Sequence, residues 1–257
     1  MEQELPVLEK KLKEHGVTRL IVDSYQAEKG YLESLNQCVK VIYMDDMAED
    51  IYQIAGVIHY SNWPWDTTYT QRYEGLDTIC MAGMEYTPLR AEFYPSVEER
   101  RKKNILLTTG GTDPYDVAGS LLEYVKEQKA EQGQLPKENS WITLWENVNN
   151  MGEIMRDSYL AVSAGGTTLY ELCACKVPTI SFSFADNQEG FTEEMGEQGI
   201  LFYAGDARKE ESLIEIIYNK LADLWMDERL CGQFRENMGR LVDGKGVERI
   251  VDKVLRM

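Results

Sequence analysis

Residues 159–188 carry the sequence feature that most constrains the fold, the run YLAVSAGGTTLYELCACKVPTISFSFADNQ. The apolar residues at the start of this run predict a short buried strand, which leads directly into Gly165 and Gly166. Thr167 and Thr168 can then begin a helix, and a second buried strand follows that helix. A strand, a glycine turn, a helix and another strand in this order are typical of a parallel sheet covered by helices.

A second Gly-Gly-Thr turn, at Gly110, Gly111 and Thr112, also follows a predicted strand and precedes a predicted helix. Ligands of open α/β sheets bind beyond the carboxyl ends of the strands, and unpaired amides at helix starts attract phosphate. Both turns could instead be ordinary connections that need glycine for backbone reasons alone. Their occurrence together, with Asn187 and Gln188 after a third predicted strand, favours a phosphorylated ligand.

Other residues could complete such a site. Glu171 lies one turn into the predicted helix, where its carboxylate could bind ribose hydroxyls or simply compensate the helix dipole. Val148 and Asn149 belong to a loop whose backbone could contact a base edge or only cap a helix. Of the two histidines, His15 follows a helix end, and His59, near a strand end, is the better candidate for acid–base catalysis.

Charge and cysteine content limit the classes of function. A formal net charge of −17 argues against nucleic acid as a partner. No apolar run approaches the ~20 residues of a membrane-spanning helix, and no signal peptide is evident, so we expect a cytoplasmic protein. Cys173 and Cys175 have no histidine near them in the sequence, so neither a metal site nor a cofactor is predicted.

Strands and helices alternate in two sets, which predicts an α/β protein with two lobes. The segment between the sets contains prolines and a run of charged residues, as linkers often do. We therefore expect an N-terminal α/β lobe and linker at residues 1–98 and a C-terminal nucleotide-binding lobe with a helical C-terminus at 99–257. In the second lobe the sequence predicts strands at 104–108 and 141–144 and a helix at 115–128.

The sequence motifs of the chain resemble those of a known family. The second lobe is similar to the C-terminal half of GT-B proteins related to the lipid II-forming N-acetylglucosaminyltransferase. The whole chain resembles the UDP-2,4-diacetamido-2,4,6-trideoxy-β-L-altropyranose hydrolases of pseudaminic acid synthesis and the related spore-coat polysaccharide proteins. The motifs that carry the resemblance occur in the family's order between about residues 20 and 190: Val22-Asp23-Ser24-Tyr25, Tyr43-Met44-Asp45-Asp46, Pro88-Leu89-Arg90-Ala91-Glu92-Phe93, Thr109-Gly110-Gly111-Thr112-Asp113-Pro114, the segment 163–171 and Ala185-Asp186-Asn187-Gln188.

The resemblance implies a GT-B-like fold of two Rossmann-type lobes with a UDP-sugar between them. It implies a hydrolase in which water displaces UDP at the anomeric carbon without a metal. The residues that it implies for each part of the ligand are Gly110, Gly111, Thr112, Gly165, Gly166, Thr167 and Thr168 for the diphosphate, Glu171 for the ribose, the Val148 and Asn149 backbone for the uracil, and Asn187, Gln188 and Tyr25 for the sugar or a phosphate.

The chain departs from the family at its start. The family begins with a strand and a Gly-x-Gly-His-x-x-Arg loop whose histidine is the main catalytic candidate, and the chain has no such motif. We therefore expect a truncated N-terminal lobe that lacks ~60–70 residues. Self-association, or a partner chain that supplies this segment, is expected.

Three functions remain open at this point. The first is a UDP-sugar hydrolase of surface polysaccharide or nonulosonic (pseudaminic-type) acid biosynthesis. The second is a GT-B glycosyltransferase that uses a UDP-sugar donor. The third is a nucleotide-sugar-binding subunit without catalytic activity.

Overall fold

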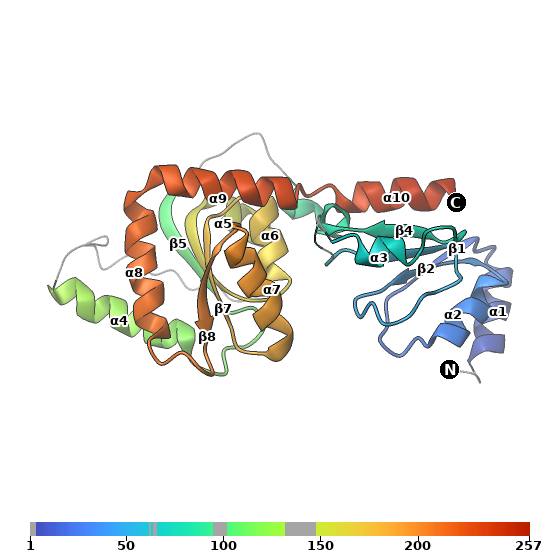
Figure 1. Cartoon of the computed structure of the whole chain (residues 1–257), viewed down its shortest axis with the longest axis horizontal. Coiled ribbons are helices and arrows are strands. Elements are labelled where there is room, and N and C mark those ends of the chain that lie inside the picture. Colours follow the sequence, from blue (N-terminus) through green and yellow to red (C-terminus); the bar gives the residue numbers. More distant parts are fainter. Residues whose placement is uncertain (1–3, 62, 64–65, 95–101, 132–147) are drawn as a thin grey trace. The chain divides into compact units, whose positions relative to one another are not determined.

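The structure, a computed structural model, describes residues 4–61, 63, 66–94, 102–131 and 148–257 (Figure 1). The chain divides into two compact units. The N-terminal unit comprises Met1–Pro88 together with Lys245–Met257, and the C-terminal unit comprises Leu89–Gly244. These limits differ from the expected ones, 1–98 and 99–257, chiefly because the last helix of the chain belongs to the N-terminal unit.

The N-terminal unit is built on a four-stranded parallel sheet with the order β1-β2-β3-β4. The strands are β1 (Arg19–Val22), β2 (Lys40–Met44), β3 (Gly56–His59) and β4 (Ile79–Ala82). The helices are α1 (Leu5–Glu14), α2 (Lys29–Asn36), the short α3 (Thr68–Gln71), the 3-10 turn η1 (Met84–Tyr86) and α10 (Gly246–Arg256).

Successive side chains of a strand point to opposite faces of a sheet, so the strands of this unit contribute to two apolar clusters. On one face, Val41 and Val57 pack with Leu32 and Leu35 of α2. On the other face, a smaller cluster joins the strands to α10; its buried members are Ile42, Ile58, Met81, Ile250 and Val254. The C-terminal helix therefore completes the core of the N-terminal unit.

The C-terminal unit contains a second four-stranded parallel sheet, with the order β5-β6-β7-β8. Its strands are β5 (Lys102–Thr108), β6 (Ser158–Ala164), β7 (Thr179–Ser183) and β8 (Phe202–Asp206). The helical elements are η2 (Ala91–Phe93), α4 (Val117–Glu131), α5 (Met151–Asp157), α6 (Thr168–Ala174), α7 (Asp186–Glu197), α8 (Leu213–Met226) and α9 (Glu228–Leu241).

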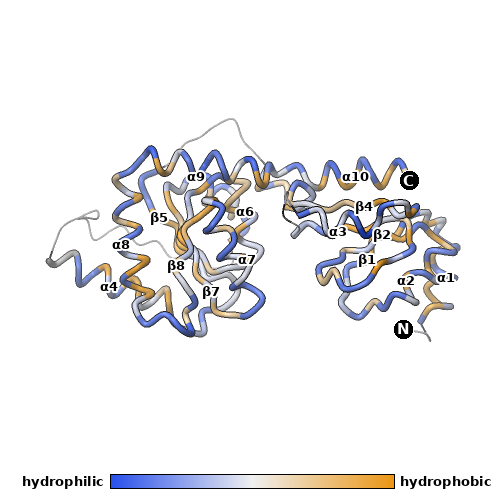
Figure 2. The backbone as a smooth tube through the Cα atoms, viewed as in Figure 1, coloured by the Kyte–Doolittle hydropathy of each residue, from blue (hydrophilic) through white to orange (hydrophobic). Residues whose placement is uncertain are grey.

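The core of the C-terminal unit surrounds its central strands. Every residue of β6 and of β7 is buried, as expected for parallel strands covered on both faces. Helices α4 and α8 pack together, and α6 packs with α9. In Figure 2 hydrophobic segments lie within the sheet of this unit, whereas the outer turns of α9 are hydrophilic.

The α/β class with two parallel sheets, expected from the sequence, is confirmed. Helix α4 begins at Val117 rather than 115, because the Asp113 carboxylate accepts hydrogen bonds from the backbone amides of Val117 (3.0 Å) and Ala118 (2.9 Å). The strand expected at 141–144 lies outside the described residues. Within the part of the chain that the structure covers, no helix is both long and apolar enough to span a bilayer.

Candidate functional site

The four strands of the C-terminal sheet are parallel, so the segments that follow them emerge at one edge. Beyond β5 lie Gly110, Gly111 and Thr112, and beyond β6 lies the Gly165–Thr168 turn. The structure therefore brings the two Gly-Gly-Thr turns and the start of α7 to the same edge of one sheet. This carboxyl edge is the candidate site.

The first turn exposes its backbone. Gly110 has φ +76°, a conformation that favours glycine, and a Cβ atom at Gly110 or Gly111 would meet nothing within 4 Å. The Gly110 amide donates to Thr108 Oγ1 at 3.4 Å. Asp113 holds the start of α4, which fixes the end of the turn.

The second turn needs glycine for a different reason, which is the close approach of α7. A Cβ atom at Gly165 would lie 2.4 Å from Thr192 Oγ1 and 3.2 Å from Gln188 Cβ. The Gly165 amide also donates to Phe182 O at 2.7 Å, which ties the turn to β7. The turn after β6 and the first turn of α7 are therefore held against each other.

Three amides of this second turn have no protein acceptor within the described part of the chain, those of Gly166, Thr167 and Thr168. The next two amides, of Leu169 and Tyr170, donate to the carbonyls of Gly166 and Thr167 at 3.0 and 3.1 Å. Helix α6 has only 7 residues, so the dipole of this helix is small and adds little to the binding of an anion. An anion at this place would be bound by the turn's own amides.

Glu171 lies in the first turn of α6 and is partly buried. Its Oε1 is 3.6 Å from Arg90 Nη2. Burial raises the pKa of the Glu171 carboxyl, while the charge of Arg90 and a hydrogen bond from it act in the opposite direction. The carboxylate is thus close to the second Gly-Gly-Thr turn but partly withdrawn from water.

The segment that carries Arg90 is fixed to α5. Arg90 Nη1 is 2.9 Å from Glu92 Oε1, and Glu92 Oε2 accepts a hydrogen bond from the Gly152 amide at 3.0 Å. Arg156 also donates to the Glu92 carbonyl. These contacts fix the start of α5, directly after Val148 and Asn149, the two residues predicted to contact a base; Val148 is partly buried and Asn149 is exposed.

The first turn of α7 presents the two predicted sugar-contacting amides differently. Asn187 is exposed and its side chain has no partner in the described structure. Gln188 Oε1 accepts a hydrogen bond from the Phe184 amide at 3.0 Å. Gln188 therefore keeps its amino group for a ligand, whereas Asn187 has both donor and acceptor to offer.

His59, the catalytic candidate from the sequence, lies in the interior of the N-terminal unit with 9% of its surface exposed. Its Nδ1 is 2.6 Å from the Asp45 carbonyl, and its ring stacks on Tyr69 with centroids 4.3 Å apart. Tyr69 in turn donates to Asp45 Oδ2 at 2.6 Å. These contacts favour a structural role for His59, because they bury the ring instead of exposing it at a strand end as the sequence suggested.

Tyr25, the other predicted site residue in the N-terminal unit, has 76% of its surface exposed. Its hydroxyl donates to Asp46 Oδ2 at 3.0 Å, and this hydrogen bond raises the Tyr25 pKa. The hydroxyl is therefore a neutral group on the surface of this unit.

Sequence reasoning missed the charged residues that follow β8. Arg208 and Lys209 form ion pairs with Asp186 and Glu189 at the start of α7, and Arg208 also pairs with Asp206 at the end of β8. The sequence shows an Asp-x-Arg-Lys pattern at this place, but the partners of these residues lie about 20 positions earlier. No group of three or more potential metal ligands occurs among the residues whose placement is known.

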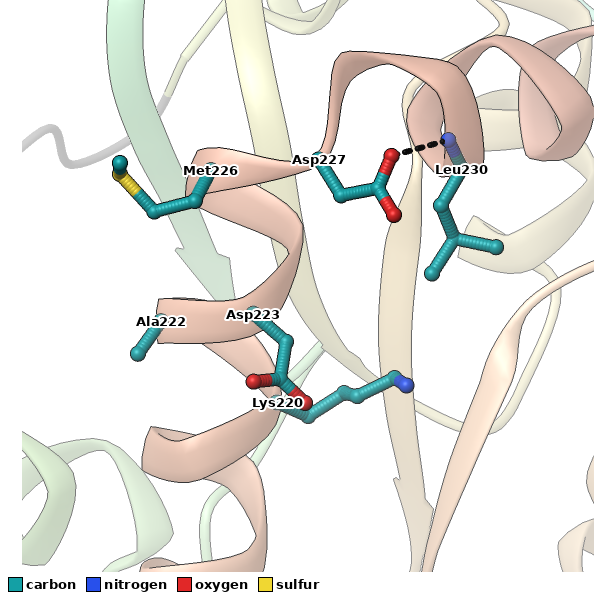
Figure 3. Close-up of a pocket in the computed structure, with 6 residues that line it drawn as sticks. All are labelled: Lys220, Ala222, Asp223, Met226, Asp227 and Leu230. Atoms are coloured by element: carbon teal, nitrogen blue, oxygen red, sulfur yellow. Dashed lines mark hydrogen bonds between the residues drawn. The ribbon is translucent and has the colours of Figure 1, made fainter.

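A surface pocket of the C-terminal unit lies elsewhere. It is lined by the end of α8 and the start of α9, with the lining residues Lys220, Ala222, Asp223, Met226, Asp227 and Leu230 (Figure 3). The carbonyl of the neighbouring Trp225 accepts a hydrogen bond from Lys103 at the start of β5, at 3.4 Å. The pocket is therefore at the amino edge of the sheet, opposite the Gly-Gly-Thr turns.

Comparison with known proteins gives distant relatives. No protein-family model matches the chain. Spore coat polysaccharide biosynthesis protein SpsG of Bacillus subtilis is 24% identical over 199 residues, which are 68% of this chain and 57% of SpsG. An uncharacterized protein of Methanocaldococcus jannaschii is 23% identical over 189 residues, 63% of this chain and 39% of that protein. The chain thus spans 39–57% of the length of these curated relatives.

Several solved structures are similar over nearly the whole chain. S. aureus MnaA in a structure with UDP has a TM-score of 0.61 at 16% identity and covers 98% of this chain and 79% of its own. MurG of Acinetobacter baumannii has a TM-score of 0.60 at 13% identity, with coverage of 99% and 78%. Anabaena HepE in complex with UDP-glucose has a TM-score of 0.51 at 11% identity, with coverage of 98% and 82%. The chain therefore has the two-lobed, parallel-sheet α/β fold of GT-B proteins such as MurG.

Proposed function

We propose that the chain binds a UDP-sugar at the carboxyl edge of the β5–β8 sheet and acts in the biosynthesis of a surface polysaccharide or a nonulosonic acid. The observation that carries this proposal is the meeting of two Gly-Gly-Thr turns, a partly buried glutamate and an amide-bearing helix start at one sheet edge. Support comes from similar folds solved with UDP and with UDP-glucose and from the distant relative SpsG.

Each part of the ligand has a proposed partner. The amides of the two Gly-Gly-Thr turns would bind the diphosphate, which suits a chain whose net charge of −17 offers little general attraction for anions. Glu171 would accept hydrogen bonds from the ribose hydroxyls. Asn187 and Gln188 would contact the sugar or a phosphate.

The proposed reaction is hydrolysis. The oxygen of a water molecule forms a bond to the anomeric carbon, the bond from that carbon to the UDP oxygen breaks, and a proton is released as free sugar and UDP form. A glycosyltransferase would use the hydroxyl of an acceptor in place of water, and two proteins of similar fold, spinosyn forosaminyltransferase SpnP and the Streptomyces glycosyltransferase SsfS6, are glycosyltransferases. A subunit that binds the nucleotide sugar without turning it over uses the same site.

The binding claim is tested by calorimetry with UDP and the variant Glu171→Ala. We expect the variant to weaken UDP binding by about tenfold or more, because hydrogen bonds to a charged group contribute about 1.5–3 kcal/mol. The matched control is Glu127→Ala, which removes an exposed glutamate on α4. Equal affinity of wild type and Glu171→Ala would remove the ribose role, and absence of UDP binding by the wild type would refute the proposed function.

The reaction is tested by measuring UDP release from UDP-N-acetylglucosamine and UDP-glucose with and without an acceptor sugar. Release that needs no acceptor supports hydrolysis. Release that requires the acceptor identifies a transferase. Tight UDP binding without UDP release from either UDP-sugar supports the third function, a nucleotide-sugar-binding subunit without catalytic activity.

A further inference from the structure

The charged residues after β8 form an ion-pair network around one arginine. Arg208 Nε lies 3.0 and 3.1 Å from the two carboxylate oxygens of Asp206, and Nη2 lies 2.6 Å from Asp206 Oδ2. The Asp206 side chain is only 3% exposed, and the Arg208 backbone amide also donates to its Oδ1 at 2.8 Å. The hydrogen bonds from Arg208 lower the pKa of Asp206. Arg208 is therefore firmly attached to the end of β8.

The other side of the same guanidinium reaches α7. Arg208 Nη1 donates to Asp186 Oδ1 at 2.6 Å, and Nη2 lies 3.6 Å from Glu189 Oε2. Lys209 adds a contact to Glu189 at 2.7 Å. Arg208 thus joins the carboxyl end of β8 to the first turn of α7, which carries Asn187 and Gln188 between Asp186 and Glu189.

This network is poorly suited to bind an anion itself. It contains three carboxylates and two cations, and the guanidinium is engaged by protein carboxylates on both sides. A phosphate would meet net negative charge here. The network instead links the end of β8 to the start of α7. We call the contacts of Arg208 with Asp206, Asp186 and Glu189 the brace.

The opposite side of the α7 turn is fixed as well. Gln188 bonds to the Phe184 amide, and Thr192 Oγ1 donates to the Gln188 carbonyl at 2.7 Å while lying against Gly165. Asn187 is exposed between these two attachments. Its position relative to the Gly165 turn therefore depends on both of them.

We propose that Arg208 is a positioning residue that fixes the first turn of α7 and so places Asn187 and Gln188 against the sugar of the bound UDP-sugar. This inference rests on the proposed function, because it assigns the sugar to that turn. UDP alone lacks the second sugar, linked to the β-phosphate, that would contact Asn187 and Gln188. Loss of the brace is therefore expected to weaken UDP-sugar binding selectively.

The test compares calorimetric affinities for UDP and UDP-N-acetylglucosamine. The double variant Asp186→Asn/Glu189→Gln removes the α7 partners of Arg208 but leaves the buried Asp206–Arg208 pair intact. We expect it to weaken UDP-N-acetylglucosamine binding by about three- to tenfold and to change UDP binding by less than about twofold. The matched control, Glu193→Gln/Glu197→Gln, removes two exposed charges of α7 that have no ion-pair partner in the described structure and should change neither affinity.

A second measurement separates failure of this inference from failure of the proposed function. Hydrogen exchange of the free protein at residues 186–190 should become faster in the double variant and in Arg208→Ala, and should stay unchanged in the control. If the wild type binds no UDP, the proposed function is refuted, and exchange alone still decides whether Arg208 fixes α7. Unchanged exchange, or equal weakening of UDP and UDP-N-acetylglucosamine binding, would overturn the positioning role.

Discussion

Glu171 is partly buried in the first turn of α6 and has Arg90 as its cation partner. Burial raises the pKa of its carboxyl above the ordinary 4.5, although Arg90 opposes the shift. A carboxylate accepts stronger hydrogen bonds than a carboxylic acid, so a ribose partner must be ionised to bind well. Protonation of Glu171 as the pH falls is therefore expected to weaken ligand binding, and to do so at a higher pH than protonation of an exposed glutamate would.

We predict that affinity for UDP-glucose falls with decreasing pH. The fall should begin at a higher pH than expected for a glutamate with the ordinary pKa of 4.5. UDP-glucose is the suitable ligand because both of its phosphates are esterified, whereas the terminal phosphate of UDP titrates near pH 6 as phosphomonoesters do. Calorimetry between about pH 4 and pH 8 measures this dependence. Glu171→Gln should bind more weakly at the upper end and lose the dependence; a variant that keeps the wild-type pH profile would exclude Glu171 as its source.

At the scale of single elements, α10 shows how a helix far along the chain can complete a distant sheet. Ile250 and Val254 are one helical turn apart and both are buried against Ile42, Ile58 and Met81. Arg19 Nε donates to the Val254 carbonyl at 2.7 Å, which holds the end of the helix over β1. The stability of the N-terminal unit therefore depends on residues after the C-terminal unit in the sequence.

We predict that Ile250→Ala destabilises the N-terminal unit by about 2–4 kcal/mol, because it leaves a cavity between α10 and the sheet. Native-state hydrogen exchange should show faster exchange in β2 and β3 and unchanged exchange in β6. Val251→Ala is the matched control, since Val251 is 45% exposed and its loss should change the free energy of unfolding by less than about 0.5 kcal/mol. Faster exchange in β6 would contradict the assignment of α10 to the N-terminal unit.

The elements that could be predicted from sequence are those with local signals. The apolar run before Gly165 and the two glycine turns indicate where strands end. The strands β5 and β6, and the carboxyl edge that they share, could therefore be predicted. The amphipathic spacing of Ile250 and Val254 predicts a helix but says nothing about which sheet it covers. The burial of His59 depends on Tyr69, and the brace depends on a pair 22 positions apart, Asp186 and Arg208; neither contact has a local pattern.

At the scale of the whole molecule, a net charge of −17 acts against any anionic ligand. Salt weakens both repulsion and attraction between charges, and the two changes have opposite effects on affinity. Salt screens the repulsion between UDP and the chain, and it would also weaken attraction to cations such as Arg90. In the proposed site, backbone amides provide most of the attraction, and amide hydrogen bonds are little affected by ionic strength. The repulsive term is therefore expected to dominate the salt dependence.

We predict that UDP binds more tightly as salt is raised from about 0.01 M to about 0.15 M, by about two- to fivefold, because the screening length shortens from about 30 Å to about 8 Å. Uridine, which carries no phosphate, is the matched control and should show no salt dependence. Calorimetric titrations of both ligands across this range measure the effect. Weaker UDP binding at higher salt would mean that local cations dominate, and the diphosphate would then have to be assigned to Arg90 or another basic side chain in place of the turn amides.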